Sequence, residues 1–167
     1  MSPRIVCLLL MAGLQVTADV SGWRTATQPE LKQIIPARAP VEKERIETEF
    51  RTASAITNGN GKYVYGVVLI TAGYAAEGKY SNYFVTQVPI RIGDLDLQPG
   101  NYVFGWHRKD DDTLAVKFYT AESGKLLGDV DAHRLNRIGP IESFRIVPPG
   151  EKAVIRIGRF GMSYMLE

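Results

Sequence analysis

The residues from 95 to 120 restrict the fold of this chain more than any other segment. They read as a proline–glycine turn, an alternating apolar segment, an acidic turn and a second alternating segment. Alternation places two apolar sets on single strand faces: Tyr102, Phe104 and Trp106 on the first strand, and Leu114, Val116 and Phe118 on the second. A turn centred on Asp111 brings the two faces together by pairing Trp106 with Val116 and Phe104 with Phe118. The segment therefore predicts a β-hairpin in an antiparallel core, with Trp106 buried and His107 at least partly exposed.

Most of the remaining chain has the same β pattern. Apolar or alternating segments are separated by turns rich in Gly, Pro and Asn: 46–56, 62–71, 81–92, 124–130, 142–147, 152–159 and 161–166. Pro89 interrupts one of them, which indicates an edge, a bulge or a change of sheet. Residues 131–138 fit one helical turn or an irregular loop. About eight or nine short strands predict an all-β fold, either a single antiparallel β-sandwich or a small barrel.

The N-terminal residues look like a targeting segment. Arg4 is followed by an apolar run over residues 5–16 and by small residues that end at Ala18. This order is typical of a signal peptide, and the run is too short for a permanent transmembrane helix. We expect residues 1–18 to be a signal peptide, the mature protein to be periplasmic or extracellular, and no membrane span to remain after cleavage.

Residues 19–45 differ from the β-rich remainder, residues 46–167. Thr27 and Glu30 have the spacing of a capping box, and Pro36 ends the apolar stripe that follows them. We expect an extended N-terminal arm with one short helix or none, joined by a surface connector to a single β domain.

Composition excludes several classes of protein. Hydrophobic residues make up 45% of the chain and charged residues 23%, as in soluble globular proteins. The formal charge of +2 is spread without a basic cluster, so we expect no nucleic-acid partner. Removal of the signal peptide would take away Cys7, the sole cysteine, and with it any disulfide or cysteine nucleophile. The absence of cysteines and of N-glycosylation sequons from the mature chain favours a bacterial origin.

A glycine-bearing segment matches part of a phosphate-binding loop. Gly73, Gly78 and Lys79 follow an apolar strand with the expected spacing. Tyr80 stands where a magnesium-binding Ser or Thr belongs, and residues 81–86 read as a strand where a helix should begin. We therefore interpret the segment as a loop between two strands.

Few residues suggest catalysis or metal binding. His107 and His133 are the candidate acid–base groups, yet their spacing resembles no metal site, and we expect surface imidazoles. The three carboxylates of residues 110–112 fit either a calcium loop or an ordinary polar turn. Calcium binding by this tip stays open, and we assign no catalytic residue, cofactor or metal ligand.

Aromatic and basic residues suggest a surface for a ligand or partner. Tyr74, Tyr80 and Tyr83 gather around the glycine-bearing loop, where aromatic rings can contact sugars or proteins. The outer face of the hairpin adds His107, Lys117 and Tyr119. These six residues are the predicted ligand or partner surface, although aromatic rings in a sheet protein more often pack in the core or at its rim.

The segment from Leu97 to Tyr102 resembles a short signature of known β-sandwiches. Its residues fit the L-x-P-G-x-Y pattern of carboxypeptidase-regulatory-like and prealbumin-like domains. In those domains the Pro-Gly pair turns the chain into a strand and the Tyr packs across the sandwich. The resemblance covers only these residues, implies an accessory, non-catalytic exported module, and carries over no catalytic residue.

These observations predict an exported, non-catalytic binding or scaffolding module. Its partner would be a protein or glycan at the cell envelope, and its oligomeric state is open. One alternative is a hydrolase acting on cell-wall or polysaccharide material, which requires a histidine within hydrogen-bond reach of a carboxylate. Another is a structural subunit of a surface fibre or envelope complex, whose arm would add to a neighbour's sheet edge.

Overall fold

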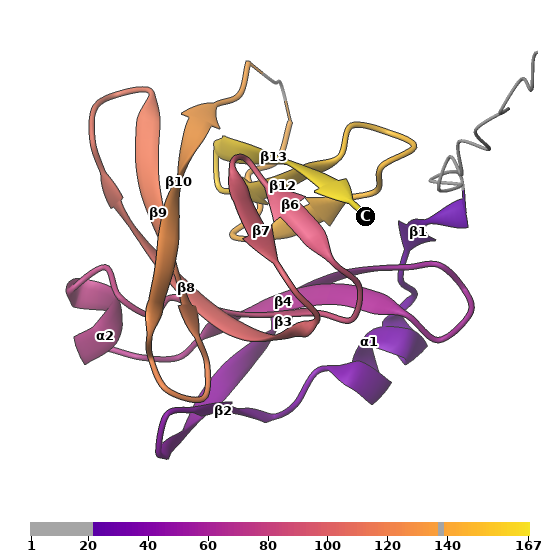
Figure 1. Cartoon of the computed structure of the whole chain (residues 1–167), viewed down its shortest axis with the longest axis horizontal. Coiled ribbons are helices and arrows are strands. Elements are labelled where there is room, and N and C mark those ends of the chain that lie inside the picture. Colours follow the sequence, from indigo (N-terminus) through magenta and orange to yellow (C-terminus); the bar gives the residue numbers. More distant parts are fainter. Residues whose placement is uncertain (1–21, 137–138) are drawn as a thin grey trace, which may run out of the picture.

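A computed structural model describes residues 22–136 and 139–167 of the chain. Its strands form one antiparallel sheet of 13 strands that curls into a nearly closed barrel (Figure 1). The all-β, antiparallel prediction is confirmed. The strand count of eight or nine was too low, and the strands belong to one connected sheet instead of the two sheets of a sandwich. The predicted signal peptide, residues 1–18, lies outside the described residues.

Along the first part of the sheet, the strands follow their order in the chain, and the last three strands follow in reverse order. Its first half contains β3 (Glu44–Thr57), β4 (Tyr63–Leu69), β5 (Asn82–Thr86), β8 (Gly100–Arg108), β9 (Thr113–Thr120) and β10 (Leu126–Arg134). It continues through β13 (Phe160–Leu166), β12 (Val154–Ile157) and β11 (Arg145–Val147). Off this path, β1 (Arg24–Thr25) and β2 (Arg38–Val41) pair with β3, and the hairpin of β6 (Ile90–Ile92) and β7 (Leu95–Leu97) pairs with β13.

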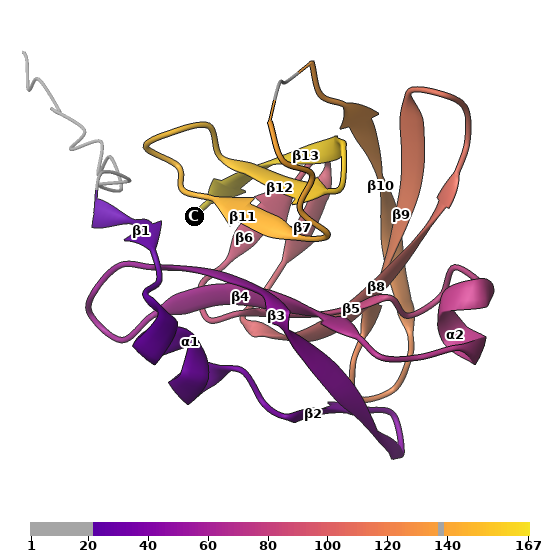
Figure 2. The same cartoon turned by 180° about the vertical axis from the view of Figure 1, so that it is seen from behind.

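The sheet curls until β11 at its far end faces β3 near its beginning, as the view from behind in Figure 2 shows, and one hydrogen bond joins the two strands. The backbone N–H of Ile146 donates a 2.9 Å hydrogen bond to the hydroxyl of Ser54. The register of β3 against β4 shifts between Glu49 and Ser54, so β3 departs from a regular ladder there. Within this irregularity the Thr52 hydroxyl accepts a 2.9 Å hydrogen bond from the backbone N–H of Val68. Side chains thus replace ladder bonds where the long strand bends.

Aromatic rings fill the barrel interior. Phe104 lies 5.1 Å from Phe118, 6.4 Å from Phe84 and 6.1 Å from Phe144, measured between ring centroids. All four rings are buried. Gly66 makes room for this cluster, because a Cβ at that position would lie 2.6 Å from the ring of Phe144.

A second apolar layer covers the outer face of the sheet. Helix α1 (Gln28–Ile34) buries Leu31 there, and Ile35, Val41 and Val67 belong to the same cluster. The Glu30 carboxylate accepts hydrogen bonds from the Thr27 backbone N–H at 2.7 Å and the Thr27 hydroxyl at 2.9 Å. The capping box is thus formed, and the arm contains one short helix. The segment after Pro36 is no loose connector: it pairs with β3 as β2, so the arm packs on its own domain.

The central hairpin keeps its predicted register but not its predicted burial. Trp106 pairs with Val116 and Phe104 with Phe118, as expected. His107 is exposed, as predicted. The burial of Trp106 was wrong: 39% of this residue is exposed. Alternation does direct Trp106 inward, but it lies beyond Phe104, where the barrel interior opens to solvent.

Two other segments refine the predicted strands. The run 81–92 is broken before Pro89 into β5 and β6, and β6 pairs with β13 on another part of the sheet. The segment 131–134, expected as a helical turn or loop, instead extends β10. Asp131 to His133 pair with β9, and ladder pairing there outweighs the weak local helix signal.

Candidate functional site

Three of the predicted surface residues do gather on the outer face of the sheet. Tyr80 lies between Tyr74, on the short helix α2 (Gly73–Ala76), and Tyr119, with centroid distances of 4.9 and 5.4 Å. The Tyr80 hydroxyl donates a 3.2 Å hydrogen bond to the carboxylate of Glu42. Burial and then this carboxylate hold the pKa of Tyr80 well above its usual value. The cluster therefore fastens the β2–β3 hairpin to the sheet.

The expected exposed aromatic patch is not formed. Tyr80 is fully buried, and Tyr83 is only 3% exposed. Burial raises the pKa of Tyr83 to about 12. His107 is exposed and Lys117 half-buried. Tyr80 and Tyr83 are thus packing residues of the outer layer, in one buried cluster with Leu31 of α1 and Val41 of β2.

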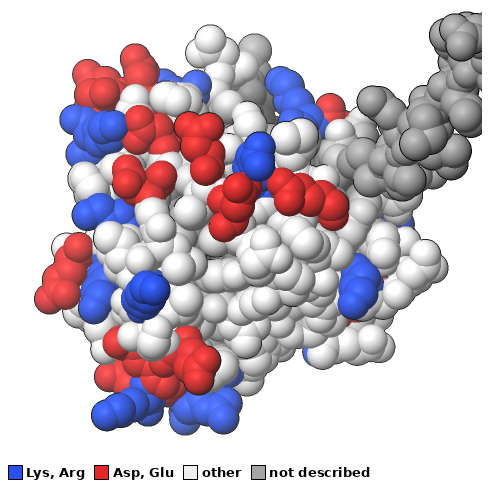
Figure 3. Space-filling model, in the orientation of Figure 1, with Lys and Arg blue, Asp and Glu red and all other residues white. Residues whose placement is uncertain are grey.

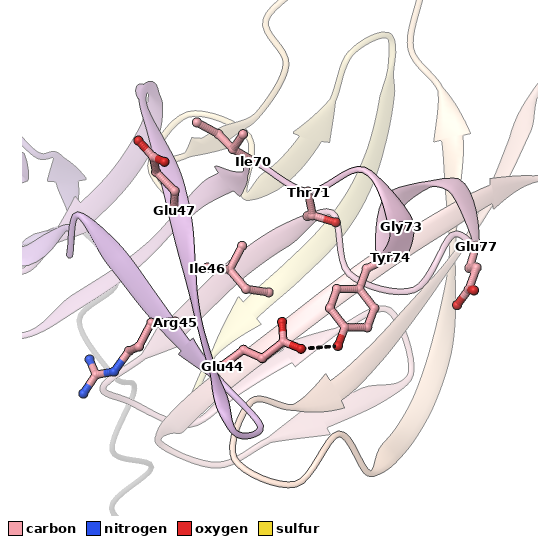
Figure 4. A pocket seen from close by; sticks show the side chains of 9 residues that line it. All are labelled: Glu44, Arg45, Ile46, Glu47, Ile70, Thr71, Gly73, Tyr74 and Glu77. Carbon is pink, nitrogen blue, oxygen red and sulfur yellow. Dashed lines mark hydrogen bonds between the residues drawn. The ribbon is translucent and has the colours of Figure 1, made fainter.

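A shallow groove beside this cluster is polar. Figure 4 shows Tyr74 reaching across from α2 toward Glu44 of β3, joined by a 3.2 Å hydrogen bond. Arg45, Glu47 and Glu77 also line the groove, and Figure 4 shows the Arg45 side chain extending away from Tyr74. The charged residues that line the groove are three glutamates and one arginine, and the Tyr74 hydroxyl is already bonded to Glu44.

The histidine–carboxylate pair expected for the hydrolase alternative is not found in the described part of the chain. Within residues 22–136 and 139–167, neither His107 nor His133 makes a hydrogen bond or ion pair with a carboxylate. Asp131, which lies near His133 in sequence, is held instead by the Lys109 ammonium group at 2.9 Å. Within these ranges, neither histidine therefore has the hydrogen bond to a carboxylate that the acid–base hypothesis required.

The acidic hairpin tip is an ordinary turn. Asp110 accepts a 2.9 Å hydrogen bond from the backbone N–H of Asp112, which lowers the pKa of the Asp110 carboxyl. No group of three or more His, Cys, Asp or Glu side chains in the described ranges is arranged to hold a metal ion.

A different cavity, which we call the mouth site, opens where Trp106 leaves the barrel interior. Its volume is about 470 Å³. The residues that line it come from both halves of the sheet and their turns: Val68, Ser81, Asn82, Trp106, Arg108, Leu114, Ile141, Ser143, Ile157, Gly158, Arg159 and Phe160. Most of the side chains are apolar, and the cavity is of the size that small-molecule ligands occupy.

Asn82 is the unusual residue of the mouth site. It is 2% exposed, and its Nδ2 is buried without a hydrogen-bond partner, the one such side-chain atom found among the described residues. Asn82 alternates with Tyr83 and shares the inner face of β5 with Phe84, the face that fills the barrel core. A buried donor without an acceptor costs about 1–3 kcal/mol. Packing gives no reason for an amide at this position.

The rim of the mouth site is apolar and exposed. Trp106 is 39% exposed and Ile141 is 56% exposed, high values for large apolar residues. The segment that carries Ile141 is held by its neighbours: the Gly158 N–H donates to the carbonyl of Glu142 at 3.0 Å, and Arg145 bonds the Glu142 carboxylate at 3.0 Å. The rim is therefore fixed in place without a ligand.

The charged groups of the mouth site are both cationic. Arg108 places its guanidinium over the ring of Phe160, 5.4 Å from the ring centroid. Arg159 occupies the tight turn between β12 and β13, where Gly158 takes a φ of +58°. No acidic residue is among the described residues that line the site.

Comparisons with known proteins identify no relative. No protein-family model, curated protein or solved structure matches the chain. In the described part of the chain, no helix has the length and apolar character needed to span a membrane.

The mouth site could not be predicted from the sequence, because its residues come from segments that are far apart in the chain. Asn82, Trp106, Ile141 and Arg159 meet only after the barrel closes. One signal was present in the sequence. Asn82 has the same strand parity as Phe84, so a polar amide stands at a position that alternation assigns to the core.

Proposed function

We propose that this protein is a binding module that takes a small, largely apolar molecule into the mouth site. The observation that supports the proposal is the buried, unpartnered amide of Asn82 beneath an exposed apolar rim. Covering Trp106 and Ile141 would stabilise the complex by the hydrophobic effect. The χ2 torsion of an asparagine is soft, so the amide can turn its donor toward an acceptor atom of the ligand.

The proposal keeps the predicted class of an exported, non-catalytic binding module and moves its site. The ligand contacts the inner face of the hairpin at Trp106, not the outer face at His107 and Tyr119. A fibre subunit is less well supported, because the N-terminal arm pairs with β3 of its own domain. The hydrolase hypothesis has lost the histidine–carboxylate pair on which it depended.

Fluorescence tests the proposal with Trp106 as the reporter. The chain has two tryptophans, so the Trp23→Phe variant leaves Trp106 as the sole indole. The neutral aromatic probe N-phenyl-1-naphthylamine should quench Trp106 emission in a saturable way as it fills the mouth site. A linear, non-saturating response would contradict the proposal.

A pair of matched variants then locates the binding. Ile141→Ser removes an apolar rim residue and should weaken probe binding about tenfold or more, a typical value for losing one buried aliphatic side chain. Ile70→Ser changes an isoleucine of similar exposure, 53%, that lies outside the mouth site. It should leave the affinity unchanged. Equal loss in both variants would show that the probe adheres to exposed apolar surface in general.

A further inference from the structure

The charges of the mouth site restrict the ligand further, if the proposed binding function holds. We propose that the ligand is an amphipathic anion, whose apolar part lies between Trp106 and Ile141 and whose negative group contacts Arg108 and Arg159. Asn82 then donates to an acceptor atom deeper in the cavity. This inference rests on the proposed function and adds the chemical class of the ligand.

The mouth site has two cations and no carboxylate among its described lining residues. Four other cavities in the described part of the molecule each include at least one carboxylate: Glu44, Glu47 and Glu77 in the first, Asp94, Asp129 and Asp131 in the second, Glu42 and Glu122 in the third, and Glu142 in the fourth. On the face drawn in Figure 3, acidic and basic side chains are likewise interleaved. Unlike these four cavities, the mouth site is lined by two cations and no carboxylate, and two cations complement an anion.

Arg108 is positioned but poorly neutralised. Its guanidinium lies against Phe160, which limits its freedom, and its nearest carboxylate is Asp111 at 3.9 Å. The Asp111 side chain is fully exposed, so solvent screens this pair. A planar guanidinium held in this way can bond an anionic group through two N–H donors.

Arg159 supplies the second cation from the turn between β12 and β13. Its side chain makes no hydrogen bond or ion pair in the described ranges. The two-residue turn that carries it is fixed by register, since Ile157 pairs with Phe160 on either side. The Cβ expected at Gly158 would lie 3.8 Å from Ile141, so the turn packs directly against the apolar rim. The second charge thus borders the surface that would hold the apolar part of the ligand.

Calorimetric titration with three probes of matched shape tests the inference. The probes are 2-naphthoate as the anion, 2-naphthylmethanol as the neutral analogue and 2-naphthylmethylammonium as the cation. We expect the wild-type protein to bind the anion about tenfold more tightly than the neutral probe, and the cation more weakly than either. The preference should fall as salt is raised, because the rim is open to solvent.

Three arginine variants assign the preference to the mouth site. Arg108→Gln and Arg159→Gln should each weaken naphthoate binding severalfold and leave naphthylmethanol unchanged. The matched control is Arg38→Gln, which removes an exposed arginine of β2 that does not line the mouth site. It should alter neither affinity. An equal loss of naphthoate affinity in all three variants would mean that the net charge of the protein causes the preference, and it would overturn the inference.

The outcomes separate the inference from the function on which it rests. If all three probes bind equally, or the cation binds best, the amphipathic-anion inference fails while the mouth site remains a binding site. If none of the three probes binds, and the neutral naphthylamine probe does not bind either, the proposed function fails and the inference fails with it.

Discussion

The backbone N–H of Ile146 in β11 donates a 2.9 Å hydrogen bond to the hydroxyl of Ser54 in β3, although 92 residues separate them along the chain. This bond lies at the seam where the two ends of the sheet meet. Phe144, which precedes β11, packs on Phe104 in the interior next to the mouth site. The hydrogen bond at the seam therefore helps to position Phe144 in the core next to the mouth site.

Removal of the Ser54 hydroxyl tests the seam. The Ser54→Ala variant leaves a buried N–H without its acceptor, so its free energy of unfolding should fall by about 1–3 kcal/mol. Ser163→Ala, at an exposed position of β13, should change it by less than about 0.5 kcal/mol. Urea denaturation followed by circular dichroism measures both. Equal stability of the two variants would mean that the seam is closed by packing alone.

The amide of Asn82 should lower the stability of the fold and strengthen the binding of a ligand. Asn82→Leu replaces a buried donor that has no partner with an apolar side chain of similar size. We expect the free energy of unfolding to rise by about 1 kcal/mol in urea denaturation, because the unmet hydrogen-bonding group is gone. The same variant should bind the naphthylamine probe more weakly. A variant that loses stability would show that the amide serves the fold.

Gly105 should tolerate no side chain. A Cβ there would lie 2.5 Å from the carbonyl carbon and oxygen of Lys79, and backbone cannot move aside as a side chain can. Gly105→Ala should lower the free energy of unfolding by about 3 kcal/mol or more. The control Gly73→Ala, with open space around its Cβ position, should unfold at nearly the wild-type urea concentration. A mild effect at Gly105 would indicate that the α2–β5 loop is free to shift.

Glu30 gives the fold a pH dependence of known sign. Its hydrogen bonds with Arg24 and Thr27 lower the pKa of the Glu30 carboxyl from 4.5 to about 2. A lowered pKa in the folded state stabilises the protein above the unfolded pKa, and this stabilisation is lost as the pH falls from about 4.5 toward 2. Thermal unfolding of wild type and Glu30→Gln should therefore differ at pH 6 and converge near pH 2.

Glu122→Gln serves as the control for this titration. The Glu122 carboxylate makes no hydrogen bond or ion pair within the part of the chain that the structure describes. Its variant should follow the wild-type melting temperature across the whole range. A Glu30→Gln difference that stays constant with pH would rule out the carboxylate as its source.

Local patterns predicted much of the framework. The pairing of Trp106 with Val116 follows from strand alternation around one turn, and α1 follows from Thr27 and Glu30 at capping-box spacing. Both depend on residues that are close in sequence. The short strand β2 was not predicted, because its four residues include Pro40 and form a strand only by pairing with β3.

Burial at the ends of the barrel could not be predicted in the same way. Alternation correctly directs Trp106 to the inner face but cannot say where the interior stops. Nor can the sequence show that Tyr80 and Tyr83, beside the glycine-bearing loop, are buried in the apolar cluster that also contains Leu31 of α1 and Val41 of β2. Exposure depends on which distant segments pack above a strand, and the mouth site exists only because Ile141 and Arg159 arrive from the far end of the chain.

The most direct test of the account is to observe Asn82 itself during binding. In ¹H–¹⁵N spectra of the full-length protein, the side-chain amide pair of Asn82 is assigned by its loss in Asn82→Leu, and the indole N–H of Trp106 by its retention in Trp23→Phe. Titration with 2-naphthoate should shift both signals together while the backbone amides around Tyr74 stay still. Shifts confined to the groove between Tyr74 and Glu44, with Asn82 and Trp106 unmoved, would contradict a ligand site at the barrel mouth.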